Sequence, residues 1–337
     1  MAQVDVARRE ARTRGATEDD DDFHVLLEQH RAEIRLHCYR MLGSIQDAED
    51  LTQETFLKAW RRRDAFERRS SLRTWLFRIA TNTCLDALDG RKRRLLPNDQ
   101  LPPSDPDRSG VASPELEWLE PYPDRMLDEL SDPATRYARR ETVELAFLVA
   151  IHALPPRQRA ALLLRDVLEW SVAETAGMLG CSRASINSAL QRARATMRRR
   201  ALDRVEGSAP ATSVERELLA RYVRAFEAAD VATLTDIIRE DATMTMPPDA
   251  AWFAGREAIV RFLDRHVFAE RGPLHLVPTA ANRQPAFAVY ERRDRWLHGL
   301  SLQVLTPGNG RIVAITGFVD PALLTVFGMP LTMPVAE

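Results

Sequence analysis

Carboxylates and arginines recur in this sequence at spacings that suit binding rather than catalysis. Asp47, Asp50 and Glu54 follow one another at intervals of three and four residues, with Lys58 four residues further on. Ser44, with Asp47 three residues later, is a capping-box signal, so we predict that a helix starts here and gathers them into an acidic stripe. Residues 91–94 form a dense basic cluster, R-K-R-R, which suits phosphate groups. No paired carboxylates, catalytic triad or Cys/His ligand spacing stands out, so we predict no catalytic site, no metal site and no cofactor.

A second binding surface is predicted between Val172 and Gln191. Gly180 supplies a turn between two helical segments, and Ser182 can cap the second one. Apolar residues recur every three or four positions in that second segment, so polar side chains share its opposite face. Arginine can pair with guanine in a major groove, and Asn or Gln with adenine. The polar side chains of this recognition face are Arg183, Ser185, Asn187, Ser188, Gln191, Arg192 and Arg194.

The elements that must position these groups fall into several domains, as 337 residues with a hydrophobic fraction of 45% allow. Residues 1–22 are a polar tail for which we predict disorder. Residues 23–94 lack proline and have a helical pattern. Residues 95–134 are acidic and rich in proline, which predicts an extended linker. Residues 135–204 are helical again, and 213–330 change to an α+β pattern.

Charge is segregated along the chain rather than present in excess. The net charge of −2 argues against a general nucleic-acid binder, yet local clusters decide partners better than the sum. Cys38, Cys84 and Cys181 are far apart and predict buried, reduced thiols. No apolar run approaches the ~20 residues of a membrane span. We therefore expect a cytoplasmic protein with no membrane partner.

The last part of the chain predicts two helices, a strand, a third helix and an antiparallel sheet. The helices are placed at 215–229, 231–239 and 255–268, and the strands at 242–246, 274–279, 286–292, 296–305 and 312–318. The string A-W-F-A-G-R-E-A-I, residues 251–259, resembles the SnoaL-like cone-shaped barrel fold. Cone folds of this type include isomerases and cyclases.

An apolar pocket in this tail is a further expectation. Its candidate lining residues are Trp252, Phe253, His275, Tyr290, Trp296, His298 and Phe318. For His275 and His298, a satisfied or surface histidine is the simpler interpretation than a general base.

The string D-A-E-D-L-T-Q-E-T-F-L-K-A-W, residues 47–60, closely resembles the extracytoplasmic-function class of bacterial sigma factors. The resemblance covers about 23–94 and 141–200, and it implies two all-α sigma domains. It assigns contacts with core RNA polymerase, through its clamp and flap regions, and contacts with promoter DNA. The implied core-binding residues are Asp47, Asp50, Leu51, Gln53, Glu54 and Phe56. Charge spacing alone favours a solvated acidic face on an ordinary helix, and the resemblance is what points to a docking surface.

The same resemblance implies that the helix beginning near Ser71, with the loop before it, captures a flipped base of the −10 element. The residues so assigned are Arg68, Arg69, Trp75, Arg78, Asn82, Arg91, Lys92, Arg93 and Arg94. A core tryptophan is the alternative for Trp75. The helix-turn-helix resembles the −35 domain of the family. It departs at Asn187 and Ala189, where the family often carries basic residues, so the preferred element can differ.

The linker contains W-L-E-P-Y-P-D, residues 118–124, which resembles a signature of sigma factors with SnoaL-like tails. We expect Trp118, Leu119 and Tyr122 to dock on a folded domain of the same chain; a plain tether is the alternative. In related sigma factors the tail acts as an in-built regulator, and we expect that role here through contact with the sigma domains.

The overall prediction is a promoter-specificity subunit of bacterial RNA polymerase that is not itself an enzyme. Two alternatives remain at this stage. One is a ligand-responsive helix-turn-helix regulator, and the other is a SnoaL-like isomerase or cyclase fused to a DNA-binding module. The sequence does not show whether a separate anti-sigma factor exists.

Overall fold

The computed structural model describes residues 23–66, 71–108, 116–130, 142–202, 213–272 and 274–335. A first helical unit contains α2 (Arg31–Leu42), α3 (Ile45–Arg61) and α4 (Leu72–Ala87), with the short η1 (Arg63–Ala65) after α3. A tight turn at Gly43 and Ser44 joins α2 to α3, and both of these helices pack against α4. The described helices include none with the length and apolar character needed to cross a membrane.

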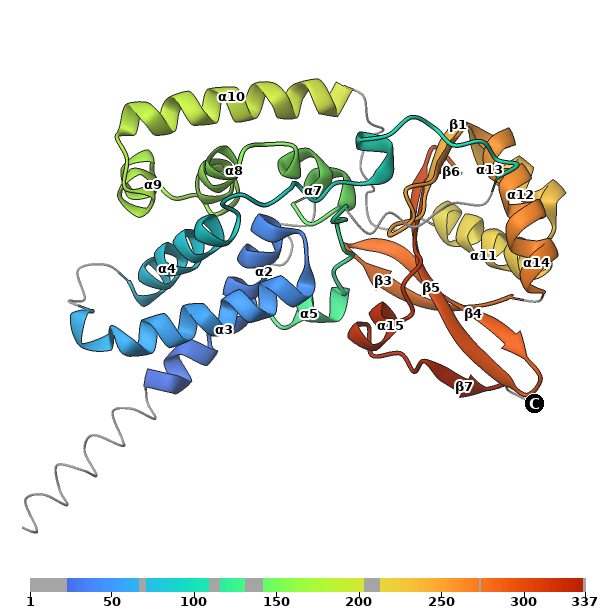
Figure 1. Cartoon of the computed structure of the whole chain (residues 1–337), viewed down its shortest axis with the longest axis horizontal. Helices are drawn as coiled ribbons and strands as arrows, with labels where there is room; N and C mark the ends of the chain where they lie inside the picture. Colours follow the sequence, from blue (N-terminus) through green and yellow to red (C-terminus); the bar gives the residue numbers. More distant parts are fainter. Residues whose placement is uncertain are drawn as a thin grey trace, which may run out of the picture.

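The described part of the linker, 95–108 and 116–130, carries two short helical pieces, η2 (Pro97–Asp99) and α5 (Asp124–Asp128). A second helical unit follows. It contains α7 (Leu145–His152), α8 (Pro156–Leu162), the π-helical η3 (Leu163–Val167), α9 (Val172–Leu179) and α10 (Arg183–Leu202). Figure 1 shows both helical units on one side of the molecule and the tail on the other, with α5 at the boundary.

The tail domain is a curved sheet with helices packed on it (Figure 1). Its helices are α11 (Ser213–Glu227), α12 (Val231–Ile237), α13 (Arg256–Phe262), the π-helical η4 (Leu263–Phe268), α14 (Ala269–Arg271) and α15 (Ala322–Val326). Its strands are β1 (Ile238–Thr245), β2 (Trp252–Ala254), β3 (Leu274–Ala281), β4 (Gln284–Arg293), β5 (Trp296–Gly308), β6 (Arg311–Phe318) and β7 (Thr332–Pro334). The strand order is β2-β1-β6-β5-β4-β3, and β7 pairs with β5.

The α+β architecture predicted for the tail is confirmed. Each predicted strand overlaps an observed one, and only β1 and β6 are paired in parallel. The pattern missed β2, β7 and α15, which have three, three and five residues. Such short elements complete no period of their own, so they leave no signal in the sequence.

One hydrophobic core joins the two helical units, the linker and the outer part of the tail sheet. It includes Leu36 of α2, Leu148 of α7, Leu119 and Tyr122 of the linker, and Ala288 of β4, all at most 2% exposed. The tail has a second core of its own on the other face of the sheet. The linker is therefore a packed part of the structure rather than a plain tether.

Candidate functional site

The acidic stripe lies on α3, whose start is set by its own sequence. The Ser44 hydroxyl accepts a hydrogen bond from the Asp47 amide at 3.2 Å, which confirms the predicted first turn. The small residues on one side of α3 are buried in the helical core. Asp50, Gln53 and Glu54 are exposed on the other side, where a partner could reach them.

An apolar groove of about 440 Å³ lies beside this stripe. Leu27, Gln53, Phe56 and Leu57 are among the residues that line it, and Leu57 is 56% exposed. Phe56 itself is only 8% exposed, so it shapes the floor of the groove more than its rim. Carboxylates next to an apolar groove offer charge and contact area to a partner helix.

Asp47 differs from the rest of the stripe because its partners lie outside α3, whereas Glu54 pairs with Lys58 of the same helix. Its Oδ2 lies 3.0 Å from a guanidinium nitrogen of Arg91 and 3.0 Å from one of Arg94. The surface predicted to run through Asp47, Asp50 and Glu54 is therefore divided. Only its later part faces solvent, because the chain after α4 folds back over the first turn of α3.

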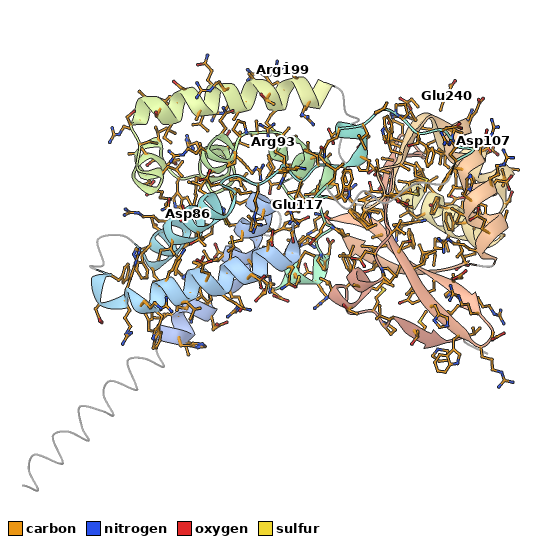
Figure 2. All side chains as sticks on the ribbon, in the orientation of Figure 1. Asp86, Arg93, Asp107, Glu117, Arg199 and Glu240 are labelled. Carbon is orange, nitrogen blue, oxygen red and sulfur yellow. The ribbon has the colours of Figure 1, made fainter. Side chains whose placement is uncertain are left out.

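The polar face predicted for α4 is present and partly covered. Trp75, Arg78, Asn82 and Asp86 line one cleft of about 350 Å³, and Asp86 marks its position on α4 in Figure 2. Trp75 is half-buried, with its ring 5.1 Å from that of Phe66. The Trp75 side chain is therefore neither a fully buried core residue nor a fully exposed one. Arg68 and Arg69 lie outside the described residues.

The second helical unit packs against this part of α4. The side-chain amide of Asn82 donates a hydrogen bond to the backbone carbonyl of Met178 in α9 at 3.4 Å. Phe77 of α4 meets Trp170 edge-on at 4.9 Å between ring centroids, and the Arg73 guanidinium lies over both rings. The face assigned to −10 DNA is therefore in contact with the unit assigned to −35 DNA.

The basic cluster, residues 91–94, lies in extended chain beyond the end of α4. Arg94 has a side chain only 14% exposed and contacts three carboxylates. Its nitrogens lie 3.0 Å from Asp47, 3.1 Å from Glu117 and 3.5 Å from Glu120. In this conformation carboxylates of the same chain occupy the Arg94 guanidinium, so it is not free to bind a phosphate.

The predicted helix α10 and its exposed polar face are present, and the role of this face in reading DNA stays a prediction. Ser182 accepts a hydrogen bond from the Ser185 amide at 3.1 Å, and Gly180 has a φ of 61° that glycine adopts readily. Ile186 and Leu190 are buried, at 2% and 3% exposure. All seven polar side chains of the face are exposed. Arg194 alone among them forms an ion pair within the described chain, as a bidentate contact with Asp166 on η3.

The linker signature, residues 118–124, is buried where the helical units and the tail meet. The Trp118 indole donates to the Pro248 carbonyl of the tail at 2.9 Å. Leu119 is fully buried against Gly43, whose φ is 76°. A Cβ at Gly43 would lie 2.9 Å from Leu119 and 2.7 Å from the His152 ring, so this close approach requires glycine.

Tyr122 places the same signature against α2. Its ring lies 4.6 Å from that of Tyr39, and its hydroxyl accepts a hydrogen bond from Arg35 at 3.2 Å. The Tyr39 hydroxyl donates to the Glu120 carbonyl at 2.6 Å. Burial raises the pKa of both tyrosines, so their hydroxyls stay protonated.

Asn282, which the sequence analysis did not predict, connects the tail to the linker and to both helical units. It sits in the β3–β4 turn with a φ of 56° and is fully buried. Its side-chain oxygen accepts from the Tyr122 amide at 2.8 Å. Its side-chain nitrogen donates to the Val143 carbonyl at 2.8 Å and to the Tyr39 hydroxyl at 3.2 Å. The only sequence signal is an Asn-Arg pair between two strand patterns, which predicts a turn but no partner.

A buried arginine fastens the two helical units together. Arg159 of α8 is 1% exposed and donates to the Met41 carbonyl at the end of α2 and to the His152 carbonyl at the end of α7. Helix carboxyl ends carry partial negative charge, which suits a guanidinium. Burial, and then the nearby charge of Arg93 (Figure 2), lowers the pKa of Arg159 to about 9.

Linker carboxylates pair with arginines from all three domains, and we call this set the acidic clasp. Its pairs are Asp99 with Arg200, Asp107 with Arg261 and Arg265, Glu117 and Glu120 with Arg94, Asp124 and Asp128 with Arg283, and Glu129 with Arg35. Solvent-exposed pairs, such as Asp107 with Arg261 and Arg265, weaken in salt, whereas Arg35 and Arg94 are mostly buried. The clasp therefore combines salt-sensitive surface pairs with more protected ones.

The predicted lining of a tail pocket is wrong. A cavity of about 180 Å³ exists, but none of the seven predicted residues lines it. Side chains alternate along a strand, so Val289 faces this cavity and Tyr290 faces the other side, where its hydroxyl donates to Pro330. The Trp252 indole donates instead to the linker at Leu101, at 2.8 Å.

The remaining predicted pocket residues are also placed elsewhere. Phe253 is buried and stacks on Phe262 at 4.3 Å between ring centroids. Trp296 is 52% exposed at the start of β5, and His298 pairs across the sheet with Glu291. His275 is exposed and contacts Glu227 at 2.9 Å. Residue type alone did not predict the lining of the cavity, because strand register decides which side chains face inward.

Comparison with protein families finds three matches in chain order. They are Sigma-70 region 2 at residues 26–94, Sigma-70 region 4 at 144–197, and a nuclear transport factor 2 domain at 214–287. The last corresponds to the α+β tail.

Individual relatives agree with this order. The chain is 44% identical over 335 residues to the ECF RNA polymerase sigma factor SigG of Mycobacterium tuberculosis, covering 98% of this chain and 90% of the relative. SigW of Bacillus subtilis is 28% identical over 55% of this chain and 91% of its own length. The crystal structure of the M. tuberculosis extracytoplasmic function sigma factor SigJ has the same fold, with a TM-score of 0.60 at 22% identity over 92% of this chain and 99% of that one. This chain belongs to the extracytoplasmic-function family of RNA polymerase sigma factors.

Proposed function

We propose that this protein is a promoter-specificity subunit of RNA polymerase, and that its linker and tail hold it in a closed arrangement until it binds. The observation that carries the proposal is the separation of two exposed surfaces. α3 presents Asp50 and Glu54 beside an apolar groove, whereas α10 presents seven polar side chains suited to a major groove. One surface fits a protein helix and the other fits duplex DNA.

Core polymerase would bind at the exposed part of the acidic stripe. Asp50, Gln53 and Glu54 supply polar contacts, and Leu57 supplies exposed apolar area at the groove. Leu51 and Phe56 are more buried than these residues and pack beneath the exposed surface of α3. Asp47 would act differently, because it is held by the basic cluster until the linker moves.

Promoter DNA would bind through α10 and, after opening, through α4. Asn82 is in contact with α9, and Arg94 is surrounded by three carboxylates. Both must be released before they can contact the −10 strand. Glu117 and Glu120 occupy the guanidinium where a phosphate would otherwise sit. The tail supports the closed arrangement because Asn282 and Arg283 bind the linker.

A charge-reversal experiment tests the core-binding role. In the double variant Asp50→Lys, Glu54→Lys, affinity for core RNA polymerase measured without promoter DNA should fall at least about tenfold, because attraction becomes repulsion. Glu240→Lys changes an exposed carboxylate of the tail (Figure 2) and should leave the affinity unchanged. Equal affinities for the double variant and the native chain would contradict the proposal.

Transcription in vitro tests the closed arrangement. We expect a chain ending near Glu206 to direct more initiation by core RNA polymerase than the full chain, because it lacks every tail contact to the linker. The point variant Asn282→Ala should shift activity in the same direction with the tail still present. If both variants initiate like the full chain, the tail has no regulatory role.

A further inference from the structure

The tail cavity is lined by residues of the tail, and its wall is mostly apolar. It lies among α11, α13, η4 and the inner face of the sheet, and its volume is about 180 Å³. Apolar residues from these different elements include Phe226, Met244, Phe262, Leu263 and Val289. A β-bulge beside Tyr290 shifts the register of β5, and both Leu300 and Ser301 line the cavity.

One polar group in this wall lacks a partner. The Nε2 atom of His266 is buried and has no hydrogen bond within the described part of the chain. The other ring nitrogen, Nδ1, lies 3.0 Å from the Glu270 carboxylate. A carboxylate only accepts, so Nδ1 carries the proton and Nε2 of the neutral ring is an acceptor. A buried acceptor without a donor is costly, and a bound hydroxyl group would satisfy it.

The backbone that carries His266 is itself unusual. His266 belongs to η4, a π-helical segment from Leu263 to Phe268 that interrupts the helix after α13. π-helical turns are rare and occur frequently at functional sites. Three of its residues, Leu263, His266 and Val267, line the cavity. The irregular turn thus places a histidine among apolar neighbours.

Other ionisable groups line the cavity besides His266. Asp249 reaches it from the loop 246–251 between β1 and β2, and Glu270 and Arg271 reach it from α14. Burial raises the pKa of Asp249, which favours its uncharged form. Glu270 and Arg271 have opposite charges, so neither sign of charge dominates the lining. The lining therefore favours an uncharged ligand.

We propose that this cavity binds a small, uncharged, mostly apolar molecule that carries a hydroxyl group, and that this hydroxyl donates a hydrogen bond to Nε2 of His266. The apolar wall supplies the binding energy and His266 supplies the orientation. Nothing in the sigma role requires this site, so the inference goes beyond the proposed function.

Occupation of the cavity would act on the linker through the loop 246–251 and Trp252, the first residue of β2. The outer side of this loop and Trp252 are hydrogen bonded to linker residues at several points. Trp118 donates to the Pro248 carbonyl at 2.9 Å, and the Ser104 amide donates to the Trp252 carbonyl at 2.8 Å. A ligand that contacts Asp249 on the inner side shifts the same loop. The site would thereby couple a small molecule to the fastening of the sigma domains.

A binding assay with 2-naphthol, a compact apolar alcohol with intrinsic fluorescence, tests the site on the full chain. We expect saturable binding, and binding of naphthalene about fivefold weaker, which is the loss of one hydrogen bond of about 1 kcal/mol. His266→Leu should weaken 2-naphthol about fivefold and leave naphthalene unaffected. His275→Leu removes an exposed tail histidine outside the cavity and should change neither.

Two further measurements test the cavity and its coupling to the linker. Ser301→Leu, which fills the cavity from β5, should abolish binding of both compounds. Hydrogen exchange of the Ser104 amide should change by at least about twofold on saturation with 2-naphthol. Absence of binding to the native chain, or equal 2-naphthol affinity in folded His266→Leu and native chains, would overturn the site. Unchanged Ser104 exchange would overturn the coupling. The assay needs neither polymerase nor DNA, so its failure leaves the proposed function untouched.

Discussion

At the scale of single residues, Asn282 is the side chain whose contacts reach the most parts of the molecule. We predict that Asn282→Ala destabilises the full chain by about 2 kcal/mol more than Asn309→Ala. Asn282→Ala leaves buried groups of Tyr122 and Val143 without partners, which costs about 1–3 kcal/mol. Equilibrium unfolding in urea measures the difference.

Asn309 is a matched control because it also lies in a turn between two strands with a positive φ, 52° against 56°. It is exposed, so its replacement reports only the cost of placing alanine in this conformation. Equal effects of the two replacements would mean that the contacts of Asn282 with the linker and the second helical unit do not stabilise the molecule.

His152 gives the helical interface a pH dependence. Burial, and then the neighbouring charge of Arg159, lowers the pKa of His152 well below its ordinary value of 6.5. The unfolded chain therefore takes up a proton near pH 6.5 while the folded chain does not. Stability from this group is present above that pH and is lost as the pH falls, by at most about 1.4 kcal/mol per pH unit.

We predict that His152→Gln reduces the loss of stability between about pH 7 and about pH 5.5 by roughly 1 kcal/mol. Urea unfolding at the two pH values measures it. His24→Gln changes an exposed histidine, 66% exposed, and should leave the pH dependence as it is. A His152→Gln chain with the pH dependence of the native chain would show that another group dominates this range.

At the scale of elements, we propose that α10 presents some residues that specify a sequence and others that bind phosphate. We predict that Asn187→Ala in holoenzyme costs about 1–3 kcal/mol on the preferred promoter and relaxes base preference. Arg192→Ala should instead weaken all promoters alike and reduce the salt dependence by about one phosphate contact. Promoter binding at several salt concentrations measures both. A uniform loss for Asn187→Ala would remove its role in base recognition.

The linker is an element held by charge, and its fastening should respond to salt. We predict that the double variant Asp99→Asn, Glu117→Gln has a larger radius of gyration by small-angle X-ray scattering at low salt. It loses links to Arg200 and Arg94. About 0.5 M salt should expand the native chain in the same direction.

Asp105→Asn is the control for this experiment, because Asp105 accepts a hydrogen bond from the Asp107 amide within the linker itself. Its replacement should leave the radius unchanged at either salt concentration. Equal radii for the double variant and this control would show that apolar burial of Leu119 and Tyr122 alone holds the linker in place.

At the scale of the whole molecule, the sequence predicted elements well and their mutual placement poorly. The helix starts at Ser44 and Ser182 and the strands of the tail follow local periods, so they could be found. The pairing of Asp47 with Arg94 and the insertion of Asn282 join segments far apart in the chain. No local pattern encodes such contacts, so the closed arrangement could not be foreseen. The tail cavity was misassigned for the same reason, because the register at Tyr290 is set by neighbouring strands.

The position of Asn282 in the chain has a consequence for newly made protein. About 80 residues separate the end of α10 from the turn that contains Asn282. At a synthesis rate of about 5–20 residues per second, both helical units leave the ribosome roughly 4–16 seconds before that turn leaves it. During this interval the nascent chain carries its polymerase and DNA surfaces without the tail contacts that later restrain them. Each newly synthesised molecule thus passes once through a stage in which the tail does not yet restrain these surfaces.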